Sequence, residues 1–255
     1  MTKSNTRIAL VTGASRGLGR STAQKLAEAG TDIILTYKNN EADAHAAVQQ
    51  IEEQGRRAAA LQLDMADSKS FTSFADAVKR ALVEIWQCQQ FDYLVNNAGG
   101  GIHVPFAETT EEQFDLLANV HLKGTFFLTQ KLLPLIKDGG RIVNTSSGLT
   151  RFTFPGHAAY AAMKGGIEVL TRYMAKELGP RGIAVNTIAP GAIETDFGGG
   201  AVRDNPQANA QVASVTAMGR AGLPDDVGGA VAALLSSGNN WITGQRIEIS
   251  GGMML

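Results

Sequence analysis

Short apolar runs, each ended by glycine or by a polar residue, recur along the whole chain. The first run, Ile8-Ala-Leu-Val11, stops at Thr12-Gly13. Strands that are buried on both faces of a parallel sheet have this continuous apolar character, whereas half-exposed strands alternate. The pattern predicts strands over residues 8–11, 33–37, 58–63, 93–95, 141–145, 183–188 and 246–249.

Segments of helical composition separate these runs. Helices are predicted over residues 18–29, 41–54, about 68–86, mostly over 111–137, about 157–178, and 225–236. Strands that alternate with helices across short connections form a parallel sheet with helices on both faces. The chain is therefore predicted to be a single domain over residues 1–255, an α/β fold with one Rossmann-type, doubly wound sheet of about seven strands.

The stretch from about residue 195 to 217 interrupts this rhythm. It contains Phe197-Gly-Gly-Gly200 and a polar piece with Asn205-Pro206. A long irregular segment inside a compact domain is usually functional or disordered. Because it follows the end of the sixth strand, where ligands of open α/β sheets bind, we expect it to be a substrate lid.

Composition narrows the class of partner. Of 255 residues, 23 are basic and 24 acidic, and this balance disfavours a nucleic acid or an anionic membrane as the partner. No apolar run approaches the roughly 18 residues of a membrane helix, and Met1–Arg7 lacks the apolar core of a signal peptide. Cys88 has no intrachain partner, and the four histidines show no metal-ligand spacing. We expect a cytoplasmic protein with a small-molecule substrate and no metal.

The segment Thr12-Gly-Ala-Ser-Arg-Gly-Leu-Gly19 joins the first predicted strand to the first helix. Its glycines permit a tight turn and a close approach of a pyrophosphate to the helix N-terminus. The spacing differs from the usual G-x-G-x-x-G, and an isolated match of this kind would indicate only an ordinary turn. The strand before it and the helix after it favour dinucleotide binding.

Tyr160 and Lys164 are four residues apart on a predicted helix, so their side chains share one face about 5–6 Å apart at Cβ. A tyrosine alone, with a pKa near 10, is a poor acid–base group at neutral pH, and a neighbouring ammonium favours the phenolate. Ser147 follows the fifth strand at the same sheet edge. Both hydroxyls can therefore converge on one substrate oxygen, although Tyr-x-x-x-Lys on its own would equally fit a packed core tyrosine.

These motifs together resemble the short-chain dehydrogenases/reductases along nearly the whole chain. The resemblance rests on the Thr-Gly-x-x-x-Gly-x-Gly turn, Asn96-Asn97-Ala98-Gly99, Asn119, Ser147, Tyr160-Ala-Ala-Met-Lys164 and Pro190-Gly191. Within the family, the chain is most similar to 3-oxoacyl-carrier-protein reductases and glucose-dehydrogenase-like members. Divergent enoyl reductases place the lysine seven residues after the tyrosine, where this chain has Ile167.

The resemblance implies an enzyme that interconverts a ketone and a secondary alcohol. Tyr160 would transfer the proton and Ser147 would bind the carbonyl oxygen. Lys164 would lower the tyrosine pKa and hold the nicotinamide ribose, and Asn119 would anchor a water that links Lys164 to solvent. The implied cofactor contacts are Gly13, Ser15, Arg16, Gly17, Leu18, Gly19, Tyr37, Lys38, Asp64, Met65, Asn97, Ala98, Gly99, Tyr160, Lys164, Pro190, Gly191, Ile193 and Thr195.

The end of the second strand indicates which nicotinamide cofactor binds. NAD-selective sites usually place a carboxylate here, but this chain reads Thr36-Tyr37-Lys38-Asn39. Lys38 and Arg16 could instead bind a 2′-phosphate, which a carboxylate would repel. NADP(H) is therefore predicted in preference to NAD(H).

Substrate and assembly are less sharply indicated. Residues 149–155 should help frame the pocket, where inward-pointing Phe152 and Phe154 would favour an apolar or acyl substrate. The helix that starts at His157 is small or apolar on nearly every face, so we expect one face to meet another subunit, and the family resemblance points to a tetramer. A sugar or polyol dehydrogenase and a non-catalytic NADP(H) sensor or scaffold remain alternatives.

Overall fold

The computed structural model describes residues 6–255, and residues 1–5, within the stretch where no signal peptide is predicted, lie outside the described part. All seven strands pair in parallel, in the order β3-β2-β1-β4-β5-β6-β7. The predicted doubly wound α/β fold is confirmed. The strands are β1 (Ile8–Val11), β2 (Asp32–Tyr37), β3 (Ala58–Gln62), β4 (Phe91–Asn96), β5 (Ile136–Thr145), β6 (Ala184–Pro190) and β7 (Arg246–Ile249).

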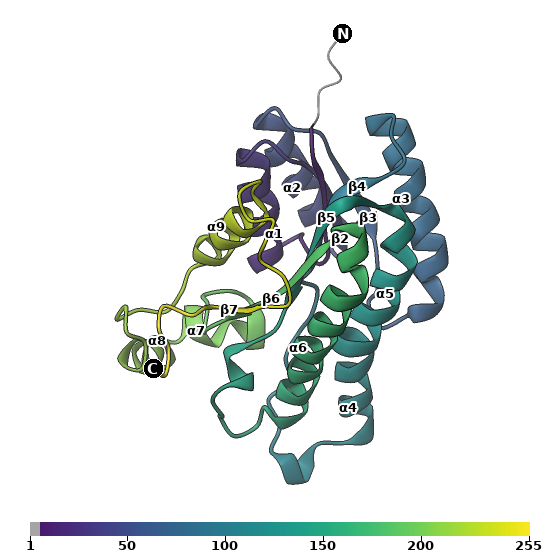
Figure 1. Cartoon of the computed structure of the whole chain (residues 1–255). Coiled ribbons are helices and arrows are strands. Elements are labelled where there is room, and N and C mark those ends of the chain that lie inside the picture. The colour runs from purple at the N-terminus through teal and green to yellow at the C-terminus, as the bar shows by residue number, and fades with distance from the viewer. Residues whose placement is uncertain (1–5) are drawn as a thin grey trace.

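Helices cover both faces of the sheet (Figure 1). They are α1 (Gly17–Glu28), α2 (Glu41–Glu53), α3 (Phe71–Trp86), α4 (Glu111–Leu117), α5 (Gly124–Leu132), α6 (Ala158–Leu178), α7 (Ala201–Asp204), α8 (Pro206–Ser214) and α9 (Pro224–Leu235). Successive strand residues point to opposite faces, so Ile8 and Leu10 pack with α3 and α5, while Ala9 and Val11 pack with α1, α2 and α9. This two-sided burial explains the unbroken apolar runs.

The stretch predicted to be mostly helical, residues 111–137, is helical up to residue 135 but is divided into several pieces. The chain forms α4, then a π-helical turn over residues 118–123, then α5, and β5 already begins at Ile136. Pro134 lies in the 3₁₀ turn that follows α5, because its ring lacks an N–H for continued α-helical bonding. The π turn shifts the phase of the side chains between α4 and α5, which a 3.6-residue periodicity does not predict.

The segment predicted as irregular, residues 195–217, contains the short helices α7 and α8. The Asn205 side chain accepts hydrogen bonds from the backbone N–H groups of Gln207 and Ala208, and Pro206 occupies the first turn. This is a strong helix-start signal inside a glycine-rich sequence. The expectation of a long irregular segment is therefore corrected.

The strand order creates a crevice. β1 pairs with β2 on one side and with β4 on the other, so the chain reverses its direction of progress across the sheet between β1 and β4. Ligands of open α/β sheets bind outside the carboxyl ends of the strands at such a switch point. The motifs from the sequence gather at this edge. Among the described helices, none is both long and apolar enough to cross a membrane.

Candidate active site

The glycine turn lies between β1 and α1 and is packed so tightly that side chains are excluded. A Cβ on Gly19 would lie 2.3 Å from the Gly13 carbonyl oxygen, and one on Gly13 would lie 2.8 Å from Cα of Ala98. A Cβ on Gly17 would make only an ordinary contact, 3.8 Å from Thr195, but its φ of +56° favours glycine. Ser15 lies in this turn, and Leu18 packs against the core under α1.

The N-terminus of α1 is available to an anion. No side chain caps it at Arg16, and its first turn contains no acidic residue. Its free N–H groups and the helix dipole favour a phosphate at this position. The turn therefore fits a dinucleotide pyrophosphate.

A buried threonine fixes the second cofactor-side turn against the first. Thr12 Oγ1 accepts hydrogen bonds from the backbone N–H groups of Asn97 and Ala98, at 2.9 and 3.0 Å. The Asn97 side chain in turn donates to the Thr12 and Gly13 carbonyl oxygens at 2.9 and 3.2 Å. Thr12 appears in the motif but not among the predicted site residues, and its signal was a polar residue at the end of an apolar strand.

The end of the cofactor site where the 2′-phosphate is predicted to bind carries polar side chains that solvent can reach. Lys38 Nζ lies 3.0 Å from a carboxylate oxygen of Asp64. Burial raises the pKa of Asp64, but the Ala66 N–H and Lys38 outweigh it, and the net pKa is lowered. Arg16 is exposed and pairs only loosely with Asp196, at 3.5 Å. Arg16 is therefore readily available to an anion, whereas Lys38 is paired with Asp64.

Two other predicted cofactor contacts near this end, Tyr37 and Met65, differ in their surroundings. The Tyr37 hydroxyl donates to a Glu41 carboxylate oxygen at 3.1 Å. Met65 was predicted to contact the adenine, but its side chain is buried in the hydrophobic core beside α3. A strand-end position alone does not reveal to which side a side chain turns.

The end of β6 closes the crevice from the other side. A Cβ on Gly191 would lie 2.9 Å from Cα of Ser250, so only glycine fits after Pro190. Ile193 pairs with Gly222 in an isolated bridge, and the Thr195 side chain lies near the glycine turn at Gly17. The predicted contacts in this stretch thus follow the carboxyl end of β6, and one of them, Thr195, lies beside the glycine turn.

Three of the four predicted catalytic side chains gather at the carboxyl ends of β5 and the start of α6. Tyr160 and Lys164 are both buried, and Lys164 Nζ lies 5.6 Å from the centre of the Tyr160 ring. Lys164 donates to the Thr145 carbonyl oxygen at 2.7 Å. Ser147 interacts with the Tyr160 hydroxyl and accepts a hydrogen bond from the Leu149 N–H at 3.2 Å.

Ser146, the adjacent alternative to Ser147, points elsewhere. Its hydroxyl donates to a Glu168 carboxylate oxygen at 2.6 Å. Glu168 also accepts from Thr150 and Arg246, so this group forms a structural network behind the site. The thirteen-residue interval between Ser147 and Tyr160 thus selects the serine that faces the tyrosine.

The electrostatics of the pair differ from the sequence-based expectation. Burial raises the pKa of the Tyr160 hydroxyl, and the hydrogen bond from Ser147 only partly opposes this rise. Burial also lowers the pKa of Lys164 to about 7. The predicted lowering of the tyrosine pKa by Lys164 is therefore not found in the chain by itself. Tyr160 stays protonated at neutral pH, as a proton donor must.

The role of Asn119, the fourth predicted catalytic residue, stays a prediction. Asn119 lies on the π turn, its carbonyl oxygen accepts from the Gly124 N–H, and its side chain makes no hydrogen bond among those of the described residues. His121, two residues later, is buried and packs its ring 5.2 Å from that of Tyr160 at an interplanar angle of 88°. Nothing in the sequence singles out His121, because it stands alone without metal-ligand spacing. The π turn also changes the direction in which its side chain points, which helical periodicity does not predict.

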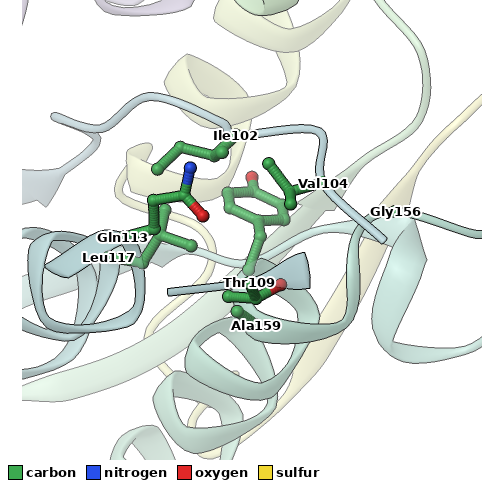
Figure 2. A pocket seen from close by; sticks show the side chains of 8 residues that line it. Ile102, Val104, Thr109, Gln113, Leu117, Gly156 and Ala159 are labelled. Carbon is green, nitrogen blue, oxygen red and sulfur yellow. The ribbon is translucent and has the colours of Figure 1, made fainter. Parts of the chain in front are cut away.

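A small cavity lies against Tyr160 (Figure 2). Its other lining residues come from the segment after β4, from α4 and from the start of α6, and they are Ile102, Val104, Thr109, Gln113, Leu117, Gly156 and Ala159. The volume is about 10 Å³, enough for roughly one water. Opening a substrate pocket therefore requires neighbouring side chains to move.

The aromatic side chain beside Tyr160 is not one of the two that the sequence indicated, Phe152 and Phe154. Phe197, from the predicted lid, lies 5.7 Å from the Tyr160 ring. Phe152 instead packs against Phe154 and lies next to Gly148, so neither belongs to this cavity. His103 and His157 pack edge to face at 5.0 Å beside Gly156.

A glycine turn that fits a pyrophosphate, at the same sheet edge as a buried tyrosine and lysine and a serine, defines the class as a nicotinamide-dependent oxidoreductase. A family model described as enoyl-(acyl carrier protein) reductase matches residues 13–254. The chain belongs to the short-chain dehydrogenase/reductase family. Position 167, where the divergent enoyl reductases carry their lysine, holds a buried isoleucine in this chain.

Two relatives match the chain over almost its whole length. The chain is 38% identical to the 3-oxoacyl-[acyl-carrier-protein] reductase of Staphylococcus aureus, over 98% of this chain and 99% of the relative. It is 34% identical to an uncharacterized oxidoreductase of Methylorubrum extorquens, over 99% and 100% of the two chains.

Solved structures are equally similar. The promiscuous reductase LugOII, which catalyses keto-reduction at C1 in lugdunomycin biosynthesis, has a TM-score of 0.93 and 39% identity, with both chains covered in full. The angucycline C-6 ketoreductase LanV with bound NADP has a TM-score of 0.92 and 35% identity, with 97% and 95% of the two chains covered.

Proposed function

We propose that this chain is an NADP(H)-dependent ketoreductase that interconverts a ketone and a secondary alcohol. The observation that carries the proposal is the convergence of Ser147, Tyr160 and Lys164 beside the turn of residues 97–99 that packs on the glycine turn. A pure binding protein has no need of a buried lysine and a buried tyrosine at this position. The catalytic set therefore argues against the sensor alternative.

The bound cofactor would supply the hydride, which no side chain can provide. Tyr160, kept neutral by burial, donates its proton to the substrate oxygen as negative charge develops there. The Ser147 hydroxyl donates to the same oxygen and strengthens that bond as the charge grows. Lys164 stabilises the phenolate that remains, and its pKa of about 7 allows it to exchange a proton at neutral pH.

The positive charges at the end of β2 and in the glycine turn support NADP(H) as the cofactor. Lys38 and Arg16 are the cations that would meet a 2′-phosphate, and the strand end offers no carboxylate in its own sequence. Asp64 competes for Lys38, so the phosphate would draw the ammonium away from it. The LanV structure contains NADP, which agrees with this preference.

The pocket supports an apolar ketone. Ile102, Val104 and Leu117 surround the Tyr160 ring, and Phe197 covers it from the segment of residues 195–217, which we propose to be the substrate lid. LugOII and LanV, by their descriptions, reduce ketones of lugdunomycin and angucycline molecules. The apolar lining favours such ketones over the sugars and polyols of the alternative reading.

The test is consumption of NADPH, with NADH in parallel, across fused-ring aromatic ketones, acetoacetyl thioesters, diketones and sugars. We expect turnover that prefers NADPH and an apolar ketone. Tight NADPH binding without turnover of any ketone would contradict the proposal.

A further inference from the structure

His121 occupies the space between the cofactor-side turn and the proton donor. It is only 2% exposed, on the π turn of residues 118–123. One side of its ring packs edge to face on Tyr160. On another side, a Cβ added to Gly99 would lie 2.4 Å from Cε1 and 2.9 Å from Nδ1. The imidazole therefore fills the gap between the turn of residues 97–100 and α6.

The surroundings fix the tautomer of this imidazole. Nε2 lies 2.7 Å from the Gly100 carbonyl oxygen, which can only accept, so Nε2 carries the hydrogen. Burial, together with the charge of Lys164, lowers the pKa of His121 to about 3, so the ring is neutral. The lone pair consequently lies on Nδ1, and this buried atom has no hydrogen-bond partner in the described part of the chain.

A buried acceptor without a donor is destabilising, so a donor to Nδ1 would be stabilising. Lys164 has donors to spare, because an ammonium carries three N–H groups and, within residues 6–255, only the Thr145 carbonyl oxygen accepts from it. The Thr145 hydroxyl oxygen is also buried without a partner. Two unpartnered buried polar atoms near one lysine are the setting in which ordered water is retained.

The ionisable groups around His121 are few. From α6, Lys164 and Tyr160 face it. The turn of residues 97–101 contributes no ionisable side chain, and Lys123 on the π turn itself is exposed. Any protonic effect of His121 therefore acts on Lys164 and Tyr160.

We propose that His121 is a positioning residue for the reaction proposed above, on which this inference rests. Its Nδ1 accepts a hydrogen bond that originates from the Lys164 ammonium and passes through a bridging water. The neutral imidazole thereby stabilises the charged form of Lys164 and ties it, with Tyr160, to the turn of residues 97–100. A protonated imidazole would instead repel Lys164, which explains why the site fixes the neutral tautomer.

The test compares His121→Phe with His121→Asn in the alcohol-oxidation direction, as a function of pH. Phenylalanine keeps a ring against Tyr160 but removes the acceptor, so Lys164 is charged less readily and the phenolate is less stable. We expect the apparent pKa of kcat to rise by about one unit, which is about a tenfold loss on the acidic limb. Asparagine retains an acceptor and should return the profile toward that of the wild type. His45→Asn, on the exposed face of α2, should change nothing.

A role in packing alone would lower kcat by the same factor at every pH. An unshifted profile for His121→Phe, or equal shifts for Phe and Asn, would overturn the inference, as would a shift produced by Asn119→Ala and not by His121→Phe. If His121→Phe does not fold, His121→Leu provides the acceptor-free variant, with circular dichroism as the check. A wild-type protein without any turnover would refute the proposed function instead.

Discussion

The Lys164 ammonium lies 5.6 Å from the centre of the Tyr160 ring and donates to the carbonyl oxygen of Thr145. One helical turn separates the two residues on α6, so the helix sets their spacing. Both are buried, which keeps Tyr160 protonated and makes the charge of Lys164 costly. Stability and catalysis therefore both depend on this pair.

The buried lysine should make the cofactor-free protein less stable at neutral than at alkaline pH. The pKa of Lys164 is about 7 in the folded chain and 10.5 without burial. Between these values the unfolded chain binds a proton that the folded chain lacks, so the free energy of unfolding rises with pH by up to about 1.4 kcal/mol per unit. Below pH 7 and above 10.5 this contribution is constant.

Lys164→Met isolates that contribution, because methionine fills a similar volume without charge. Denaturant unfolding at a series of pH values should show the wild type gaining stability relative to the variant as pH rises above about 7. Parallel curves for the two proteins would mean that Lys164 is not held in the neutral form.

Gly19→Ala should abolish dinucleotide binding. The new methyl group would lie 2.3 Å from the Gly13 carbonyl oxygen and 2.6 Å from the Asn97 side-chain nitrogen, so both turns must shift. Gly229→Ala is the matched control, since nothing lies within 4 Å of its added Cβ, and alanine favours the α9 helix by about 1 kcal/mol. NADPH titration by calorimetry distinguishes them, and full affinity in Gly19→Ala would contradict the tight turn.

Lys38→Ala should weaken NADPH far more than NADH. Loss of one charge-assisted phosphate contact is worth about 1.5–3 kcal/mol, or roughly 10- to 100-fold in KM for NADPH. Lys79→Ala, an exposed lysine on α3, serves as the control. Equal effects on the two cofactors would remove Lys38 from the 2′-phosphate site.

Helix α6 exposes a stripe of small and apolar residues in the single chain. Ala162 is exposed, Gly165 has open space beside it, and Val169 is 46% exposed. We expect a homo-oligomer, tetrameric by the family resemblance, in which Val169→Arg shifts the mass toward the monomer in sedimentation. Arg172→Ala leaves the apolar stripe intact and is the control. A wild-type monomer at micromolar concentration would contradict this prediction.

The sequence predicted the sheet well because both faces of its strands are buried, which leaves runs such as Ile8–Val11 unmistakable. It predicted Ser147, Tyr160 and Lys164 because helical spacing and strand ends determine their positions. It placed the start of β5 too late because Lys137, Asp138 and two glycines begin this strand at its polar end.

The remaining differences concern side-chain direction. The π turn places the His121 ring against Tyr160, and no linear periodicity encodes a turn of that kind. Burial, which the sequence does not quantify, decided the direction of the Tyr160 pKa. Local patterns thus located the site, while three-dimensional packing set its electrostatics.

The most direct test of the central claim is turnover of the best ketone with NADPH by the wild type and by Tyr160→Phe. Removal of one hydroxyl leaves the ring packing against His121 and Phe197 in place, so NADPH affinity should be unchanged. We expect kcat to fall by at least about 10²-fold, the usual contribution of general acid catalysis. Near-normal turnover by Tyr160→Phe, with NADPH affinity retained, would contradict the account.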